Sequence, residues 1–255
     1  MWFYKGDRTT PVINAKENII SKHGVEKLSM PKTAVLFYMR GIEYISEKYE
    51  PVLIIERFPR FLHSCPVYKL EKGDREICFL DGGRGAPQAA DTVETLNALG
   101  VRSIISVGMT GVFKEGFDVG DIIIPPKAFS EEGTSHHYYE NIEYAEPDEI
   151  LFEKATEYFS ECRKETVITT DAIYRQTYHK ERLWREKGCV GVDMETSALF
   201  SVSKYLGLNT VTILTVSDIH PLNEESSKNL GWKWQMTEQK RKEIIFKCID
   251  FGLSI

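Results

Sequence analysis

The sequence predicts one α/β domain that spans residues 1–255 and contains a mixed, largely parallel sheet with helices on both faces. The chain has 255 residues, 42% of them hydrophobic, which is enough to bury a sizeable core. Short runs of β-branched and aliphatic residues lack polar alternation, and amphipathic stretches separate several of them. Strands of that kind belong in a sheet covered on both sides, as in α/β proteins. No repeat, low-complexity tract or Pro/Ser-rich linker divides the chain.

The aliphatic runs predict strands at 33–38, 76–81, 102–107, 121–125, 166–169 and 210–217. The amphipathic stretches predict helices at 86–99, 150–162, 194–206 and 235–251. Pro87 falls in the first turn of one of these helices, where its fixed φ and its missing N–H are tolerated. Gly100 and Gly207 each follow the end of a predicted helix, where a residue in the left-handed conformation closes the last turn.

Charge and cysteine usage exclude several classes of protein. The chain carries 32 Lys+Arg against 38 Asp+Glu, a net charge of −6, so it lacks the clustered positive charge by which proteins bind nucleic acid or an anionic membrane without specificity. Its five cysteines are scattered without a CxxC pair, which favours reduced thiols over disulfides or a zinc site. No apolar run approaches a signal peptide or the roughly 20 residues of a membrane span, so we expect a cytoplasmic protein.

Glycines follow two of the predicted strands. The stretch 81–87 reads DGGRGAP and passes from a strand into a helix, where glycines allow close approach to a ligand and free N–H groups favour an anion. A tight turn with a solvated Arg84 explains the same residues. The stretch 107–111 reads VGMTG, and we expect the chain to turn there around Gly108 with a small cross-section.

Carboxylates follow two further strands. Asp193 and Glu195 precede a predicted helix, and they point the same way if the chain is still extended there, so that the pair can hold a sugar diol. Asp218 ends the most apolar strand, where partial desolvation can raise its pKa enough for a general acid. The alternatives are that Asp193 caps the helix and that Asp218 begins a turn.

Other polar and aromatic residues are weaker candidates. We interpret the stretch HHYY at 136–139 as a loop over the cleft, and His220 with Pro221 as a turn. Trp232 and Trp234 are expected to pack against the C-terminal helix rather than to stack on a base.

Several motifs together resemble a known family. The segments GGRGAP, IISVGMTGVF, VGDIIIP, GVDMETSALF and ILTVSD occur in the order and approximate spacing of the nucleoside phosphorylases, which include the purine nucleoside and uridine enzymes. The N-terminal stretch 10–15 is similar to that of the bacterial hexameric purine enzymes. The resemblance implies phosphorolysis of a purine-type nucleoside to free base and ribose 1-phosphate. It also implies a homodimer or homohexamer, with inorganic phosphate as co-substrate. No metal or redox cofactor is expected, because the sequence contains neither a metal-ligand cluster nor a dinucleotide-binding fingerprint.

The resemblance also implies roles for individual residues. Asp218 matches the acid that protonates the base, while Met194 and Glu195 match the pair that holds the ribose. Asp193 stands where relatives have a glutamate, and it is carried over as a third ribose residue. The base contacts carried over are Ser217 and Tyr174. The uracil-reading Gln-x-Arg element is missing near residues 177–179, which favours a purine.

The phosphate site departs from the family. Relatives carry Gly-Asp-Pro-x-Arg where this chain has FYMRG at 37–41, and they carry a hydroxyl where it has Met109. A rebuilt site is expected from Arg40, Arg60, Arg84 and Gly108, because a dianion needs converging charge and donors rather than fixed sequence positions. Arg60 and His63 are expected near a site shared with a neighbouring subunit. Two alternatives stay open: a nucleosidase that uses water as nucleophile, and a nucleoside-binding protein without catalysis.

Overall fold

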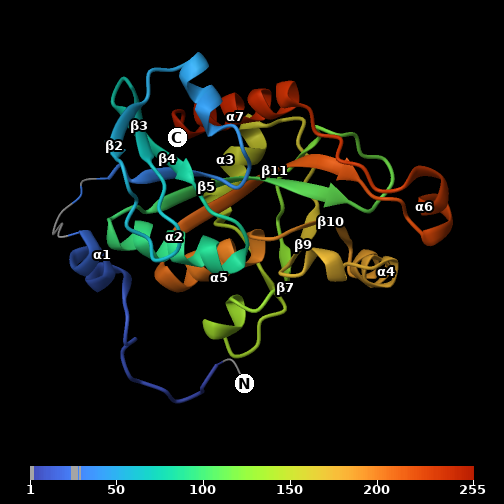
Figure 1. Ribbon diagram of the computed structural model, residues 1–255, viewed down its shortest axis with the longest axis horizontal. Coiled ribbons are helices and arrows are strands. Elements are labelled where there is room, and N and C mark those ends of the chain that lie inside the picture. Colours follow the sequence, from blue (N-terminus) through green and yellow to red (C-terminus); the bar gives the residue numbers. More distant parts are fainter. Residues whose placement is uncertain (1–2, 24–27, 29) are drawn as a thin grey trace.

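The computed structural model describes residues 3–23, 28 and 30–255, and one mixed sheet runs through the described part of the chain (Figure 1). Its strands follow the order β2-β3-β4-β1-β5-β10-β9-β7-β8, and β11 pairs with both β5 and β6. Their bounds are β1 Thr33–Phe37, β2 Val52–Ile55, β3 Val67–Lys72, β4 Arg75–Asp81, β5 Ser103–Val112, β6 Ile122–Ile123, β7 Ala128–Glu131, β8 Tyr144–Ala145, β9 Thr166–Thr170, β10 Cys189–Asp193 and β11 Asn209–Ile219.

The centre of this sheet is parallel. Strands β4, β1, β5 and β11 are neighbours in that order, with Asp81, Phe37, Val107 and Ile213 in register across them. Their carboxyl ends therefore lie along one edge of the sheet. Strand β10 runs antiparallel to β5 and parallel to β9. The predicted α/β class with a mixed sheet is confirmed.

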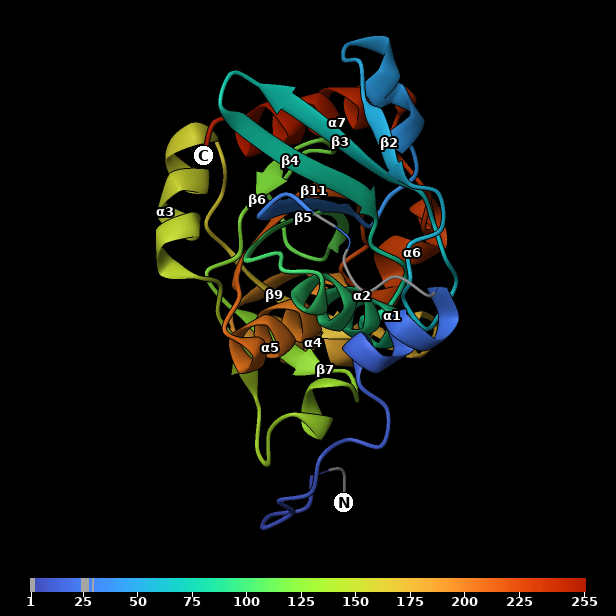
Figure 2. The same cartoon turned by 90° about the vertical axis from the view of Figure 1, so that its left-hand side faces the viewer.

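Helices cover both faces of the sheet (Figures 1 and 2). On β1, Val35 and Phe37 belong to the core cluster that includes residues of α3 and α7, whereas Ala34 and Leu36 belong to the cluster that includes residues of α2 and α5. All four side chains are fully buried. This explains why the strand sequence shows no polar alternation, since both of its faces meet apolar side chains.

The four predicted helices are present as α2 Ala86–Ala98, α3 Glu149–Tyr158, α5 Thr196–Leu206 and α7 Glu238–Gly252. Pro87 lies in the first turn of α2, and Gly100 and Gly207 have φ of +89° and +70°, as expected after the ends of α2 and α5. The sequence analysis missed the helices α1 Ala15–His23, α4 Tyr178–Glu186 and α6 Glu224–Leu230 and the 3-10 helices η1 Ile42–Glu47, η2 Ser135–His137 and η3 Ile173–Arg175.

The turn predicted at 107–111 is wrong, because β5 continues through these residues to Val112. Gly108 is instead a point of close packing: a Cβ there would stand 3.1 Å from Leu214 Cδ2 and 3.9 Å from Tyr38 Cβ. Its small size serves contact between neighbouring strands rather than a change of direction.

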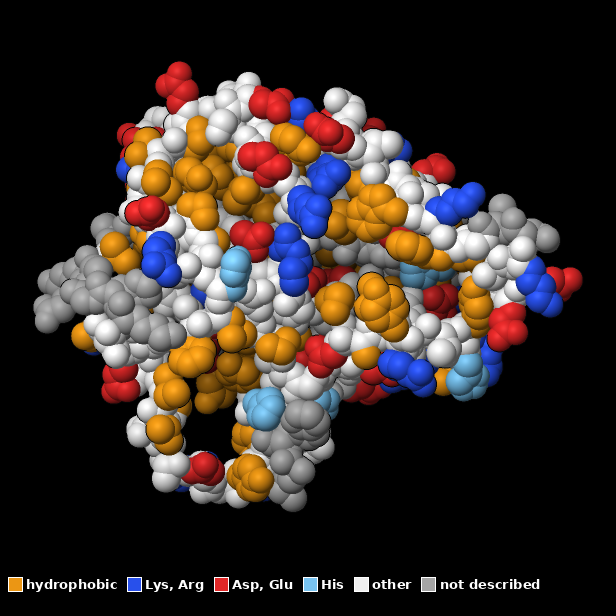
Figure 3. Space-filling view, viewed as in Figure 1, with side chains coloured by type: hydrophobic (Ala, Val, Ile, Leu, Met, Phe, Trp, Pro, Cys, Tyr) orange, Lys and Arg blue, Asp and Glu red, His pale blue; other side chains and the backbone are white. Residues whose placement is uncertain are grey.

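The surface is mixed in character. Hydrophobic side chains gather at the upper left of Figure 3, where Figure 1 places β2 and β3. On β2, Val52 and Leu53 are exposed. No helix in the described part of the chain is long and apolar enough to cross a bilayer.

Candidate functional site

Two strands that end in the predicted site residues meet β5 at a single position. Val192 of β10 and Asp218 of β11 are both in register with Gly111, one on each side of β5. A hydrogen bond ties β5 to β10, because Thr110 Oγ1 donates to the Val192 carbonyl oxygen at 3.0 Å. Ser217 Oγ of β11 lies 3.2 Å from the Thr110 carbonyl oxygen. The topology thus brings the Asp218 segment and the segment leading to Glu195 to the same end of β5.

Asp218 is buried among hydrogen-bond donors. Ser217 Oγ donates to its Oδ1 at 2.5 Å, while His220 Nε2 and Trp232 Nε1 donate to its Oδ2 at 3.0 and 2.6 Å. Burial on its own raises the pKa of Asp218, but the hydrogen bonds from His220, Ser217 and Trp232 outweigh burial and hold that pKa below its ordinary value. The raised pKa predicted from the strand-end position is therefore wrong, because a strand end shows desolvation but not the donors that the fold adds.

His220 lies between two carboxylates. Its Nε2 faces Asp218 Oδ2, and its Nδ1 lies 2.8 Å from Oε1 of Glu181, a buried residue of α4. Burial lowers the pKa of His220, yet the hydrogen bonds to Asp218 and Glu181 outweigh it and raise the pKa to about 9. The imidazole is thus held as a cation at neutral pH.

Glu195 reaches the glycine turn that follows β4. Its Oε1 accepts a hydrogen bond from the Gly85 N–H at 2.6 Å, and its side chain is half-buried. Burial and then the charge of Asp193 raise the pKa of Glu195. The turn needs its glycines, since Gly83 and Gly85 have φ of +100° and +79°. The sequence motif therefore serves as a tight turn and also presents an N–H to Glu195.

Asp193 faces other partners. Its Oδ1 accepts from Thr169 Oγ1 at 2.6 Å, and its Oδ2 accepts from the N–H of Thr196 at 3.1 Å and from the hydroxyl of the same residue. Asp193 is 6% exposed and is the last residue of β10, and its carboxylate binds the first residue of α5, Thr196. Asp193 and Glu195 thus bind different groups rather than pointing together into one site, because the chain leaves the extended conformation directly after Asp193.

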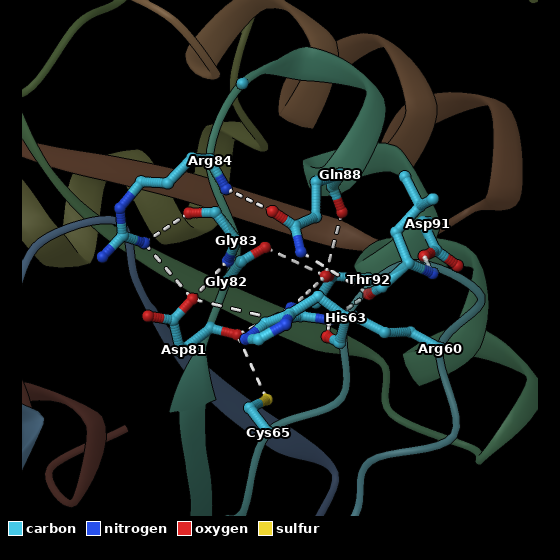
Figure 4. Close-up of polar contacts among 12 residues, drawn as sticks. Arg60, His63, Cys65, Asp81, Gly82, Gly83, Arg84, Gln88, Asp91 and Thr92 are labelled. Carbon is cyan, nitrogen blue, oxygen red and sulfur yellow. Dashed lines mark hydrogen bonds and ion pairs between the residues drawn. The ribbon is translucent and has the colours of Figure 1, made fainter.

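Two of the predicted phosphate-binding arginines meet at Asp81, at the end of β4 (Figure 4). Arg84 Nη1 lies 3.2 Å from Asp81 Oδ1, with the arginine side chain 48% exposed. Arg60 Nη1 donates to the Asp81 carbonyl oxygen at 2.8 Å and to Thr92 Oγ1 at 2.9 Å. Arg60 is buried, and its Nη2 makes no hydrogen bond within the described residues.

Arg60 also stabilises the loop that carries it. Its Nε donates to the carbonyl oxygens of Leu62 and His63 at 3.0 and 2.6 Å. Among the described residues, His63 is the one non-glycine residue with positive φ, at +41°. A left-handed non-glycine residue costs on the order of 1 kcal/mol and needs support from its surroundings, which the guanidinium gives.

Comparison with known proteins decides the family. A sequence profile of the phosphorylase superfamily matches residues 13–250. The chain belongs to the phosphorylase superfamily.

Its relatives include purine enzymes of this superfamily. A DeoD-type purine nucleoside phosphorylase of Caldanaerobacter subterraneus subsp. tengcongensis is 28% identical over 57% of this chain and 65% of its own length. A guanosine phosphorylase of Halorubrum lacusprofundi is 32% identical over 56% and 60%. A DeoD-type enzyme of Alkaliphilus metalliredigens is 30% identical over 72% and 77%. The chain spans less than two thirds of the first two, and the family predicted from the motifs is confirmed.

The remaining predicted residues of this phosphorylase superfamily member differ in exposure and in partners. Arg40 is exposed and has no hydrogen-bond or ion-pair partner in the described part of the chain. Tyr174 is 95% exposed on η3, so its side chain lines no enclosed pocket within the chain. Met194 is half-buried between Asp193 and Glu195. Ser217 contacts Asp218, as described above.

Four residues of this site, namely Tyr38, Glu181, His220 and Trp232, were not assigned to it from the sequence. Trp232, expected to pack, is 58% exposed and binds Asp218 through its indole N–H. Tyr38 is buried with its hydroxyl unpartnered among the described residues, and the pKa of Tyr38 is raised by burial and then by the charge of Glu195. The spacing Asp-x-His at 218–220 was the available signal for His220, because alternate residues of a strand share a face.

The described residues include no group of three or more His, Cys, Asp or Glu side chains arranged to hold a metal ion.

Proposed function

We propose that this protein cleaves the N-glycosidic bond of a purine-type nucleoside by phosphorolysis, giving the free base and ribose 1-phosphate. The observation that carries the proposal is the register at Gly111, which brings Asp218 and the segment leading to Glu195 to one end of β5. The names of the purine nucleoside and guanosine phosphorylases among its relatives support the same reaction.

In the proposed reaction, the carboxylate of Glu195 accepts hydrogen bonds from the ribose hydroxyls while Met194 packs beneath the sugar. The glycosidic bond breaks as positive charge develops on the sugar ring, and phosphate attacks its anomeric carbon. Asp218 hands a proton to the departing purine, which then leaves as a neutral base. Ser217 orients Asp218 through the 2.5 Å hydrogen bond to Oδ1, and Tyr174 remains the proposed stacking residue for the base.

Arg84 and Arg40 are the proposed phosphate ligands with accessible charge, and Arg84 lies two residues after Gly82 in the glycine turn. The proposed role of Arg60 requires the buried Nη2, because its other nitrogens already bind Leu62, His63, Asp81 and Thr92. Gly108 has no side chain to bind phosphate, so it would only allow the phosphate to come close to the backbone. This commitment of Arg60 to the loop favours a second candidate function, a nucleosidase that uses water in place of phosphate.

The Asp218→Asn variant tests the proposal. The amide cannot supply a proton, so release of guanine, hypoxanthine or adenine from the ribonucleosides should fall at least about a hundredfold, the lower range for loss of a general acid. The measurement is base release by the wild type and the variant, each with and without inorganic phosphate.

The two candidate reactions separate in the wild type. If ribose 1-phosphate forms, and only when phosphate is present, the result supports phosphorolysis. If free ribose forms at a rate independent of phosphate, the reaction is hydrolysis instead. An Asp218→Asn variant as fast as the wild type removes Asp218 from the mechanism. Binding of nucleosides without any base release contradicts catalysis altogether.

We further propose that the protein is a homodimer or homohexamer. Support comes from the loop next to the glycine turn, where Leu62 is 44% exposed. The loop is rigid, because Asp91 accepts hydrogen bonds from the N–H groups of residues 61 and 62 at 2.9 and 2.6 Å.

A further inference from the structure

We propose that His220 is the positioning residue that stores the proton of the reaction and passes it to Asp218, with Glu181 holding the imidazole in place. This inference rests on the proposed function and adds to it the source of the proton. Asp218 needs such a source, because its three hydrogen-bond donors favour the ionised carboxylate, which has no proton to give.

The contacts of the imidazole fix its protonation. Nε2 lies 3.0 Å from Asp218 Oδ2, and Nδ1 lies 2.8 Å from Glu181 Oε1. An ionised carboxylate can only accept hydrogen bonds, so both ring nitrogens must donate, and a histidine that donates from both is a cation. Gln176 Nε2 lies 2.8 Å from Glu181 Oε1 and 3.2 Å from His220 Nδ1. The carboxylate oxygen is the closer and the charged acceptor, so the amide donates to Glu181 and keeps that carboxylate turned toward His220.

The groups packed around the imidazole agree with this assignment. β11 contributes Asp218, α4 contributes Glu181, and β5 contributes uncharged Gly111. Phe113, directly after β5, is also uncharged, and its ring lies 6.5 Å from the imidazole. The guanidinium of Arg185, also on α4, is turned to the Phe113 carbonyl oxygen at 3.0 Å. Two anions thus face His220 and raise its pKa to about 9, although burial acts in the opposite direction.

The missing side chain of Gly111 leaves space for His220 and Asp218. A Cβ on Gly111 would stand 2.4 Å from His220 Nε2 and 3.2 Å from Asp218 Oδ2. The backbone N–H of His220 donates to the Val112 carbonyl oxygen at 2.7 Å, which fixes the imidazole over the end of β5.

The proposed transfer moves one proton and no electrons. As negative charge grows on the purine, Oδ2 of the ionised Asp218 takes the proton of His220 Nε2, and Asp218 passes a proton on to a ring nitrogen of the base. The N–H bond on His220 breaks, one N–H bond forms on the base, and Asp218 ends as it began. The histidine becomes neutral, and solvent reprotonates it before the next turnover.

The test compares three substitutions by pH profile. His220→Gln retains a hydrogen bond to Asp218 but has no proton to give, and Glu181→Gln removes one of the two anions that hold the charge on His220. Trp232→Phe is the matched control, because Trp232 donates to the same Oδ2 without being a proton source. The readouts are kcat and KM for base release across neutral and alkaline pH.

The proton relay from His220 through Asp218 predicts a distinct pH profile for the wild type and for each variant. Because His220 must be protonated, the wild-type kcat is retained below a pH of about 9 and falls as pH rises through it. His220→Gln loses at least about tenfold in kcat with little change in KM, and this alkaline fall disappears. Glu181→Gln moves the fall to lower pH, because the imidazole has lost an anion. Trp232→Phe retains the fall at the wild-type pH.

Other outcomes overturn the relay. If the wild type releases base and the alkaline fall stays at the same pH in both His220→Gln and Glu181→Gln, the proton does not come from His220, while the proposed function stands. If the wild type releases no base from any purine nucleoside, the proposed function fails and the relay with it. Should His220→Gln not fold, the shift in Glu181→Gln decides alone.

Discussion

The carboxylates of Asp193, Glu195 and Asp218 lie in different environments because different hydrogen-bond donors face them. Their residue type does not explain the difference. Asp193 is held by one threonine of β9 and one at the start of α5, Glu195 by a single main-chain N–H, and Asp218 by a serine, a histidine and a tryptophan. The sequence showed that acids follow these strands but not which donors meet them. Ser217 adjoins Asp218 in the sequence, but the other donors come from residues 85, 169, 196, 220 and 232, which only the fold brings together.

Glu195 and Asp193 should respond differently to substitution. Glu195→Gln replaces one oxygen with an amide group that cannot accept a hydrogen bond from the ribose, so we expect KM for ribonucleosides to rise about tenfold or more with an unchanged free energy of unfolding. Asp193→Ala removes the acceptor at the start of α5 and should lower the free energy of unfolding by about 1–2 kcal/mol without a comparable change in KM. Steady-state kinetics and urea unfolding of both variants check this. A folded Asp193→Ala whose KM rises as much as that of Glu195→Gln restores Asp193 as a ribose residue.

At the scale of elements, the long buried strands and the helices between them were predictable, because both carry a clear apolar period. Of the hairpin of β3 and β4, only β4 was predicted. The signal for β3 was the two-residue connection of Gly73 and Asp74 between the paired residues Lys72 and Arg75. β7 and β8 were not predictable in this way, since four and two residues are too short for a pattern. Helix α4 is rich in charged residues and buries only Glu181 and Trp184. Its sequence therefore shows no apolar period from which the helix could be predicted.

The end of α5 offers a clean test of backbone conformation. Gly207 has φ +70° and ψ +33°, and a Cβ there would meet no atom within 4 Å. Gly207→Ala should therefore cost about 1 kcal/mol from the left-handed backbone alone, and Gly207→Asn should cost less. Urea unfolding of the two variants measures the difference. Equal stability of Gly207→Ala and the wild type would mean that α5 ends differently in solution.

The whole molecule has a net charge of −6, so two copies of it repel each other. Self-association must therefore depend on steric fit and apolar contact. The loop at Leu62 adjoins the glycine turn, whereas β2 lies at the edge of the sheet. An interface at the loop would place a second subunit beside the site, as expected for Arg60 and His63 from the sequence.

Leu62→Glu should therefore reduce the proposed assembly to monomers, because the new carboxylate must be desolvated in the interface. Leu53→Glu is the matched control, since Leu53 is 51% exposed on the edge strand β2 and lies away from this loop. Light scattering gives the mass of each variant and of the wild type. A wild type that is monomeric at working concentration contradicts the assembly, and dissociation by Leu53→Glu alone moves the interface to β2.

Strand β11 pairs with both β5 and β6, so the last strand of the chain inserts into the interior of the sheet and is not added at its rim. A ribosome-bound chain that has not yet released residues 209–219 consequently exposes an unpaired apolar edge of β5. Such long-range closure is slow and leaves the emerging polypeptide open to aggregation. A chain that lacks residues 209–219 therefore cannot assemble the end of β5 at which Asp218 is in register with Gly111.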